Sequence, residues 1–180
     1  MAEDDDLSVG IQVDAAPSNT DFGIAASLST PIETAAAAPD DRALALARGV
    51  SRMLGEAGQT CLHEFTLRNG RRADVMAMAS DGTFTIIEIK SSVNDFRTDS
   101  KWPDYLEFCD HFYFAVAEDF PQEMIPESCG LIVADAYGAV ILRASVEDRI
   151  NGSRRRMLML RYAEVAGRRL MSLLDPARRL

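Results

Sequence analysis

The sequence predicts an α/β fold in which a mixed β-sheet is flanked by helices. Residues 83–90 form a nearly continuous run of β-branched and apolar residues, which is typical of a central strand covered on both faces. Two turn dipeptides, Asn69-Gly70 and Asp81-Gly82, separate this run from two earlier strand-like segments. Helical periodicity on either side of the strands completes the pattern of an α/β sandwich.

The first elements are a helix and a hairpin. The helix begins at Asp40-Asp41, whose carboxylates suit an N-cap, and it ends near Gly58. A strand at Cys61–Leu67 follows, and Asn69-Gly70 turns the chain back into a second strand at Arg71–Met78. Strict alternation divides the first strand between two faces, with Leu62, Glu64 and Thr66 on one and His63, Phe65 and Leu67 on the other.

The second half of the chain alternates between helix and strand. Ser91-Ser92 caps a helical stretch to about Asp110, which is interrupted near Pro103 because proline lacks a backbone donor. The strand at Phe112–Ala117 follows a helical crossover, so we expect it to lie parallel to an earlier strand. The last elements are strands at Gly130–Ala134 and Ala139–Arg143 and a terminal helix over residues 154–173.

The beginning of the chain differs in composition from the rest. Residues 1–41 hold nine acidic residues and no Lys or Arg, and they show neither helical nor strand periodicity. We therefore predict a disordered acidic tail over residues 1–40 and one folded domain over residues 41–180. The tail is expected to be an inert solvated segment, with DNA mimicry or recruitment of a partner as the alternatives.

The net charge of −9 comes entirely from that segment, because residues 42–180 hold 19 acidic residues and all 19 Lys and Arg. From Ile141 onward there are ten arginines and four acidic residues. A basic C-terminal segment beside an acidic middle can contact a phosphate backbone while a metal ion offsets the carboxylates. The acidic overall charge therefore does not exclude a nucleic-acid partner.

Three charged residues interrupt strands that are otherwise apolar: Asp74 in the second strand, and Glu88 and Lys90 at the end of the third. Charged residues rarely occupy buried strands unless they are paired or bind a metal. Glu88 and Lys90 are two residues apart and so share a face, and a hairpin at Asp81-Gly82 brings Asp74 beside them.

This arrangement predicts a metal-dependent hydrolytic site. Asp74 and Glu88 would hold Mg²⁺ or Mn²⁺, with the Ile89 carbonyl as a further ligand, and Lys90 would orient water or stabilise charge on the phosphate. The alternative interpretation is a structural ion pair of Lys90 with Asp74 or Glu88.

The pattern resembles a known family. The matching runs are residues 70–74, ending in Asp74; residues 87–92, around Glu88-Ile89-Lys90; and residues 95–102. They resemble the PD-(D/E)xK nuclease superfamily and, within it, the bacterial MmcB-like DNA repair proteins, over about residues 42–175. One departure is Ala73, where the superfamily often has proline. The resemblance implies a restriction-endonuclease-like core and a divalent-metal-dependent deoxyribonuclease that acts in repair.

Several other residues are candidates for binding DNA: Arg71, Arg72, Lys101, Trp102, Arg154 and Arg155. Arg71 and Arg72 flank the first hairpin turn, and a tryptophan can stack on a base, although core packing is its commoner use. The resemblance also implies that an acidic residue from the first helix assists the site. This helix offers Asp41 and Glu56 at its ends, and Glu64 on the first strand is an alternative.

Two rival functions remain at this point. One is a non-catalytic DNA- or protein-binding module of a repair complex, and the other is a phosphodiesterase that acts on a small nucleotide. DNA is the expected partner, with repair-complex proteins and a second copy of the chain as further candidates. Three widely spaced cysteines and the absence of a long apolar run predict a protein of the reducing cytoplasm with no membrane partner.

Overall fold

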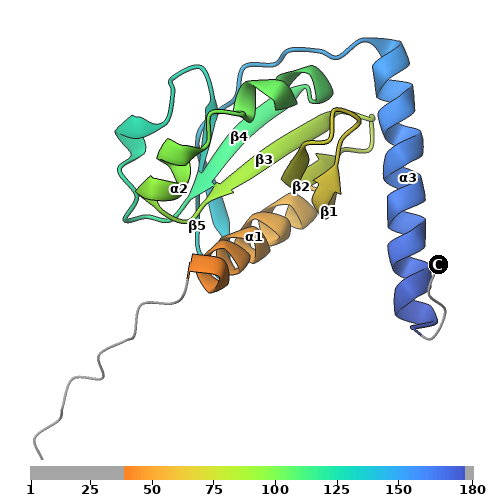
Figure 1. Cartoon of the computed structure of the whole chain (residues 1–180), viewed down its shortest axis with the longest axis horizontal. Coiled ribbons are helices and arrows are strands. Elements are labelled where there is room, and N and C mark those ends of the chain that lie inside the picture. Colours follow the sequence, from red (N-terminus) through yellow and green to blue (C-terminus); the bar gives the residue numbers. More distant parts are fainter. Residues whose placement is uncertain (1–38, 177–180) are drawn as a thin grey trace, which may run out of the picture. The chain divides into compact units, whose positions relative to one another are not determined.

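The computed structural model describes residues 39–176, so the predicted tail falls almost entirely outside the described residues. The chain between these limits forms the elements shown in Figure 1. No helix in this range has both the length and the apolar character that crossing a bilayer requires. The α/β class predicted from the sequence is confirmed.

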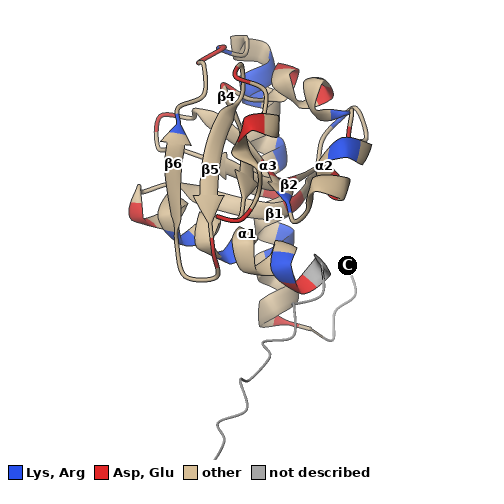
Figure 2. Ribbon diagram, turned by 90° about the vertical axis from the view of Figure 1, so that its left-hand side faces the viewer, with Lys and Arg blue, Asp and Glu red and all other residues tan. Residues whose placement is uncertain are grey.

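The centre of the fold is a six-stranded mixed sheet in which spatial order follows chain order. Its strands are β1 (Thr60–Thr66), β2 (Arg72–Met78), β3 (Phe84–Lys90), β4 (His111–Val116), β5 (Gly130–Ala134) and β6 (Ala139–Arg143). Strands β3, β4 and β5 pair in parallel, and the other neighbours pair antiparallel. Strands β4, β5 and β6 lie side by side in Figure 2.

Helix α1 (Pro39–Glu56) covers one face of the sheet, where Leu46, Val50 and Leu54 pack against apolar residues of β2 to β5. The start of this helix, predicted at Asp40-Asp41, lies slightly earlier in the structure. The helix begins at Pro39, which tolerates the first helical position because it needs no hydrogen-bond donor there, so Asp41 lies in the first turn rather than at the cap.

The opposite face carries the larger core, which is rich in aromatic residues. Helix α2 (Val93–Thr98), the 3₁₀ helix η1 (Trp102–Phe108) and part of α3 (Gly152–Leu174) pack there. Ser92 caps α2 as predicted, and the helical stretch is interrupted before Pro103 as predicted. Strand β3 is buried along its whole length, which confirms that it is a central strand.

Both early hairpins have loops of three residues rather than two. Gly70 and Gly82 adopt φ of 83° and 81°. In each loop the glycine N–H donates to the carbonyl of the residue directly after the strand, Leu67 after β1 and Ala79 after β2. The preceding Asn69 and Asp81 have negative φ, so the turns are of the wider type with a single left-handed glycine.

The predicted alternation of β1 is wrong beyond His63. Leu62, Phe65 and Leu67 all pack in the aromatic core, although an even and an odd position cannot share a face of a regular strand. The reason is Glu64, whose φ of 52° reverses the alternation at that residue. Glu64 is not a typical turn residue, so no local signal marks this reversal in the sequence.

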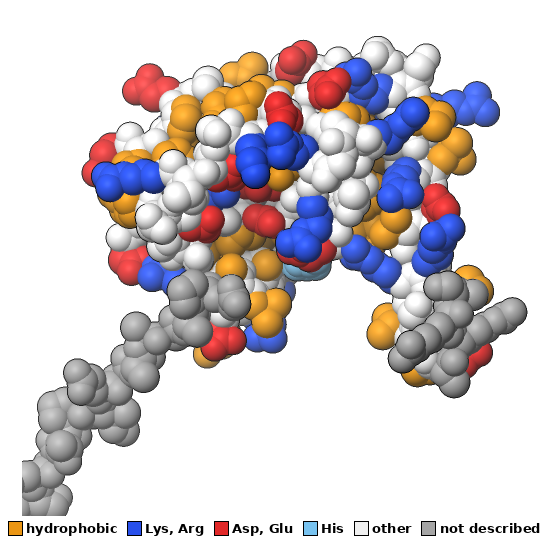
Figure 3. All heavy atoms as spheres, in the orientation of Figure 1, with side chains coloured by type: hydrophobic (Ala, Val, Ile, Leu, Met, Phe, Trp, Pro, Cys, Tyr) orange, Lys and Arg blue, Asp and Glu red, His pale blue; other side chains and the backbone are white. Residues whose placement is uncertain are grey.

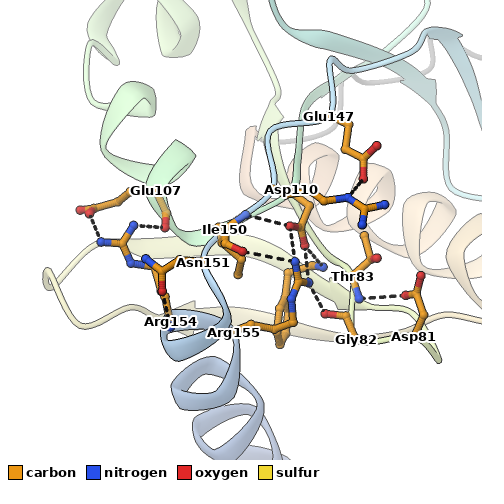
Figure 4. Close-up of polar contacts among 12 residues, drawn as sticks. Asp81, Gly82, Thr83, Glu107, Asp110, Glu147, Ile150, Asn151, Arg154 and Arg155 are labelled. Carbon is orange, nitrogen blue, oxygen red and sulfur yellow. Dashed lines mark hydrogen bonds and ion pairs between the residues drawn. The ribbon is translucent and has the colours of Figure 1, made fainter.

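A buried carboxylate, Asp110, fastens the beginning of α3 to the sheet (Figure 4). Its two oxygens accept hydrogen bonds from the backbone N–H groups of Phe84 and Ile150, at 2.7 and 3.0 Å. The Arg155 guanidinium donates to both oxygens at 2.8 Å. Residues from β3, from the segment before α3 and from α3 itself therefore meet at one side chain.

Candidate active site

The candidate site lies where β2 and β3 separate. Their backbone pairing ends at Val75 and Ile87, and beyond that point side chains take over. Oδ2 of Asp74 accepts a hydrogen bond from the Ile89 N–H at 2.8 Å, and Oε1 of Glu88 accepts one from the Asp74 N–H at 3.2 Å. Each carboxylate is thus fixed by the backbone of the neighbouring strand.

Burial makes this pair of carboxylates hard to ionise together. Glu88 is only 3% exposed, and burial, followed by the nearby charge of Asp74, raises the pKa of Glu88 to about 8. Burial also raises the pKa of Asp74, although the Ile89 N–H opposes the shift. A cation beside the two groups would remove this penalty, because it stabilises both charged forms.

Lys90 lies on the same face of β3 as Glu88, but its partner is neither of the two predicted carboxylates. Its Nζ donates to Oδ2 of Asp99, at the end of α2, at 2.5 Å. Burial alone would lower the pKa of Lys90, but the bond to Asp99 and the other carboxylates outweigh it and raise that pKa. The ion-pair alternative considered for Asp74 or Glu88 is therefore corrected to Asp99.

Asp74, Glu88 and Lys90 line one polar pocket of about 830 Å³. Residues of α1 and α2 also line it. Of the three acidic residues considered as a further ligand, Glu64 lines it, whereas Asp41 and Glu56 do not. Glu64 pairs with the Arg72 guanidinium at 2.5 Å. The pocket is lined by Ala43, Leu44, Glu64, Arg72, Asp74, Glu88, Ile89, Lys90, Ser91, Ser92, Asn94, Asp95, Thr98 and Tyr105.

The donor set suits a hard divalent cation with an incomplete protein shell. Among the described residues, the second oxygens of Asp74 and Glu88 accept no hydrogen bond, yet neither atom is sealed from the pocket. Mg²⁺ is commonly held by one or two carboxylates and completes its shell with water and phosphate oxygens. Within the described part of the chain, no cluster of three or more His, Cys, Asp or Glu forms a complete metal cage.

The structure separates the residues predicted to bind DNA. Arg72 lines the acidic pocket, whereas Arg71 is held at the hairpin by Asp104, to which it donates at 2.7 and 2.8 Å. Lys101 is exposed just before η1, and Trp102 packs in the aromatic core, with its ring centroid 5.7 Å from that of Phe112.

Arg154 and Arg155 lie at the start of α3 and away from the pocket (Figure 4). Arg154 pairs with Glu107 at 3.0 Å. Arg155 donates hydrogen bonds to the Asp110 carboxylate and to the Gly82 carbonyl.

One residue of the site carried a weak signal in the sequence. Asp99 belongs to the acidic segment that follows β3, but only the fold of α2 places it against Lys90. Asp99 does not line the pocket itself, whereas Tyr105 from the same region does, and the Tyr105 hydroxyl donates to the Arg72 carbonyl at 3.0 Å.

Comparison with known proteins gives one family and one solved structure. A family model described as "DNA repair protein MmcB-like" matches residues 31–177. A protein of unknown function from Silicibacter pomeroyi is similar in structure, with a TM-score of 0.75 and 42% sequence identity, over 80% of this chain and 97% of that one. No curated protein matches the chain.

Proposed function

We propose, from the premise that this chain belongs to the MmcB-like family of DNA repair proteins, that it hydrolyses phosphodiester bonds of DNA with the help of a divalent metal ion. The observation that carries the proposal is the pair of Asp74 and Glu88. Both carboxylates are fixed by reciprocal backbone hydrogen bonds, and Lys90 follows on the same face of β3.

The two carboxylates have the chemistry to hold Mg²⁺ or Mn²⁺ through their second oxygens, with the Ile89 carbonyl as the further predicted ligand. When bound, such an ion polarises a phosphate and makes water more acidic. The residues supply the rest: hydrogen bonds from the backbone prevent the carboxylates from turning away, so the site is organised before DNA arrives.

Lys90 supplies a positive charge beside the proposed scissile phosphate. Its side chain is 5% exposed, and the bond to Asp99 keeps it protonated and limits its rotation. A lysine held in this way stabilises the extra negative charge that develops on phosphorus-bound oxygens in the transition state. Asp99 acts through Lys90 and is a positioning residue.

The alternative is a DNA-binding module without hydrolytic activity. The observation that favours it is that the polar groups of the site already have partners within the protein. Lys90 is bonded to Asp99, and one oxygen each of Asp74 and Glu88 accepts a hydrogen bond from a backbone N–H. These contacts hold the site together without a metal ion, as a binding module would require.

The test is to incubate the full chain with labelled single-stranded, duplex and branched DNA, with Mg²⁺, Mn²⁺ or EDTA. We expect metal-dependent cleavage that falls by at least about 100-fold in Asp74→Asn, Glu88→Gln and Lys90→Ala. Asp119→Asn, which removes an exposed carboxylate outside the pocket, is the matched control. Absence of cleavage by folded wild-type protein that still binds DNA would favour the binding module.

A further inference from the structure

Besides the candidate active-site pocket, the structure has a second cavity, between the N-terminal half of α3 and the β1–β2 hairpin. This groove, of about 720 Å³, has an apolar floor that includes Phe65, Leu67, Phe108 and Leu158. Its lining also includes three arginines, Arg68, Arg154 and Arg161. No acidic residue lines it. Arginine side chains, drawn in blue, gather along α3 on the right-hand side of Figure 3.

The arginines of the groove differ in how firmly they are held. Arg154 pairs with Glu107, and its guanidinium lies 5.5 Å from the centroid of the Phe108 ring. Arg161 forms a long ion pair with Glu164, at 3.9 Å, and Arg68 is exposed at the hairpin turn. An apolar floor lined by arginine side chains favours a ligand that joins an anionic group to a flat apolar one.

We infer that this groove binds one unpaired nucleotide of a DNA strand, with its base against the apolar floor and its phosphate on the arginines. A cavity of this volume lies within the usual range of small-ligand sites, roughly 300–1,000 Å³. Arginine guanidinium planes are among the surfaces on which unpaired bases stack, and Arg154, held 5.5 Å from the centroid of the buried Phe108 ring, offers one at the groove. Asn151 and Ser153 place the positive end of α3 at the same groove, which also favours a phosphate.

The groove and the candidate active site are lined by residues of the same two elements, the β1–β2 hairpin and η1, and the inference rests on the proposed function. Phe65 and Arg68 of the hairpin line the groove, and Glu64 and Arg72 of the same hairpin line the acidic pocket. Likewise Tyr105 and Phe108, one turn apart on η1, each line one of the two cavities. A strand with its phosphate at Asp74 and Glu88 would therefore have a flanking nucleotide within reach of the groove.

The experiment measures binding rather than cleavage. Fluorescence anisotropy with a labelled single strand, and with a duplex of the same sequence, is recorded in EDTA over a series of salt concentrations. The variants are Arg68→Ala, Arg161→Ala and Met157→Asp, which places a negative charge on an exposed side chain of the groove. The matched control is Arg156→Ala, which removes the same charge from a different face of α3.

We expect each groove variant to weaken single-strand binding by about three- to tenfold, and each lost arginine to reduce the salt slope by about 0.7. The control and the duplex affinity should change less than about twofold. Groove variants that match Arg156→Ala would overturn the inference and leave the groove to another ligand, such as an acidic peptide. An equal loss for single strand and duplex would overturn it too, because it would show phosphate contacts without an unpaired base.

Failure of the proposed function is distinguishable in the same set of proteins. Lys90→Ala should lose cleavage in Mg²⁺, whereas the groove variants should lose single-strand affinity in EDTA. If no protein cleaves but the groove variants bind less well, the hydrolytic proposal falls and the nucleotide site stands. If wild type and groove variants cleave and bind alike, the groove inference alone falls.

Discussion

The ammonium group of Lys90 donates to the carboxylate of Asp99 at 2.5 Å, and both side chains are largely buried, at 5% and 18% exposure. Lys90 ends the central strand, and Asp99 immediately follows α2. The pair therefore ties the segment that covers the pocket to the strand that carries the candidate catalytic residues.

Asp99→Asn should lower the free energy of unfolding by about 3 kcal/mol, because it leaves the Lys90 charge buried beside a neutral partner. Asp104→Asn, which breaks the more exposed pair with Arg71, should cost less than about 1 kcal/mol. Urea unfolding followed by the fluorescence of the single tryptophan, Trp102, measures both. Equal small losses would show that burial adds nothing to the Lys90 pair.

Divalent metal should stabilise the folded protein. At a concentration ten times the dissociation constant, Mg²⁺ or Mn²⁺ would add about 1.4 kcal/mol, or a rise of about 4 °C in Tm. Glu88→Gln should abolish this rise and also raise Tm in EDTA, because it removes a carboxyl group whose ionisation the buried site beside Asp74 opposes. Differential scanning fluorimetry measures both effects, and an unchanged rise in Glu88→Gln would place the metal elsewhere.

Asp110 should make stability depend on acid pH. Burial acts to raise the pKa of Asp110, but Arg155 and the N–H groups of Phe84 and Ile150 outweigh it and hold that pKa below its ordinary value of 3.8. The folded state therefore binds this proton less readily than the unfolded chain does. The stabilisation is complete above about pH 5 and is lost as the pH falls through the lowered pKa.

Asp110→Asn should cost about 3 kcal/mol at neutral pH and make the acid side of the stability curve less steep. Asp119→Asn, at an exposed ion pair, should cost less than about 1 kcal/mol. Chemical unfolding at a series of pH values measures both variants. An acid side as steep in Asp110→Asn as in wild type would contradict this account.

Two glycines of α1 should respond in opposite ways to alanine. A Cβ at Gly49 would lie well inside the contact distance of the Asp135 and Gly138 carbonyl oxygens, whereas one at Gly55 would meet no atom within 4 Å. Gly49→Ala should therefore destabilise by about 2 kcal/mol or more, since the obstacle is backbone. Gly55→Ala should stabilise by about 0.5 kcal/mol through helix propensity. Thermal unfolding compares them, and similar values for both would contradict the close approach of α1 to the β5–β6 turn.

The order and type of the elements could be predicted because their signals are local. The apolar run of β3, the glycine turns and the cap at Ser92 act through neighbouring residues, and each predicted element is present. The proximity of Asp74 and Glu88 could also be predicted, because a short hairpin leaves its two strands little freedom to pair elsewhere. The local exceptions are the left-handed Glu64 and the wider loops, for which composition alone does not select the conformation.

The sequence by itself therefore determined the strands, their order and the residues able to do chemistry on β2 and β3. Tertiary structure alone decided which distant groups meet: Asp99 with Lys90, Asp110 with Arg155, and Phe108 with the arginines of α3. The physical reason is that propensity and periodicity act over a few residues. The contact between two charges 45 positions apart, as in Asp110 and Arg155, depends on how every intervening element packs.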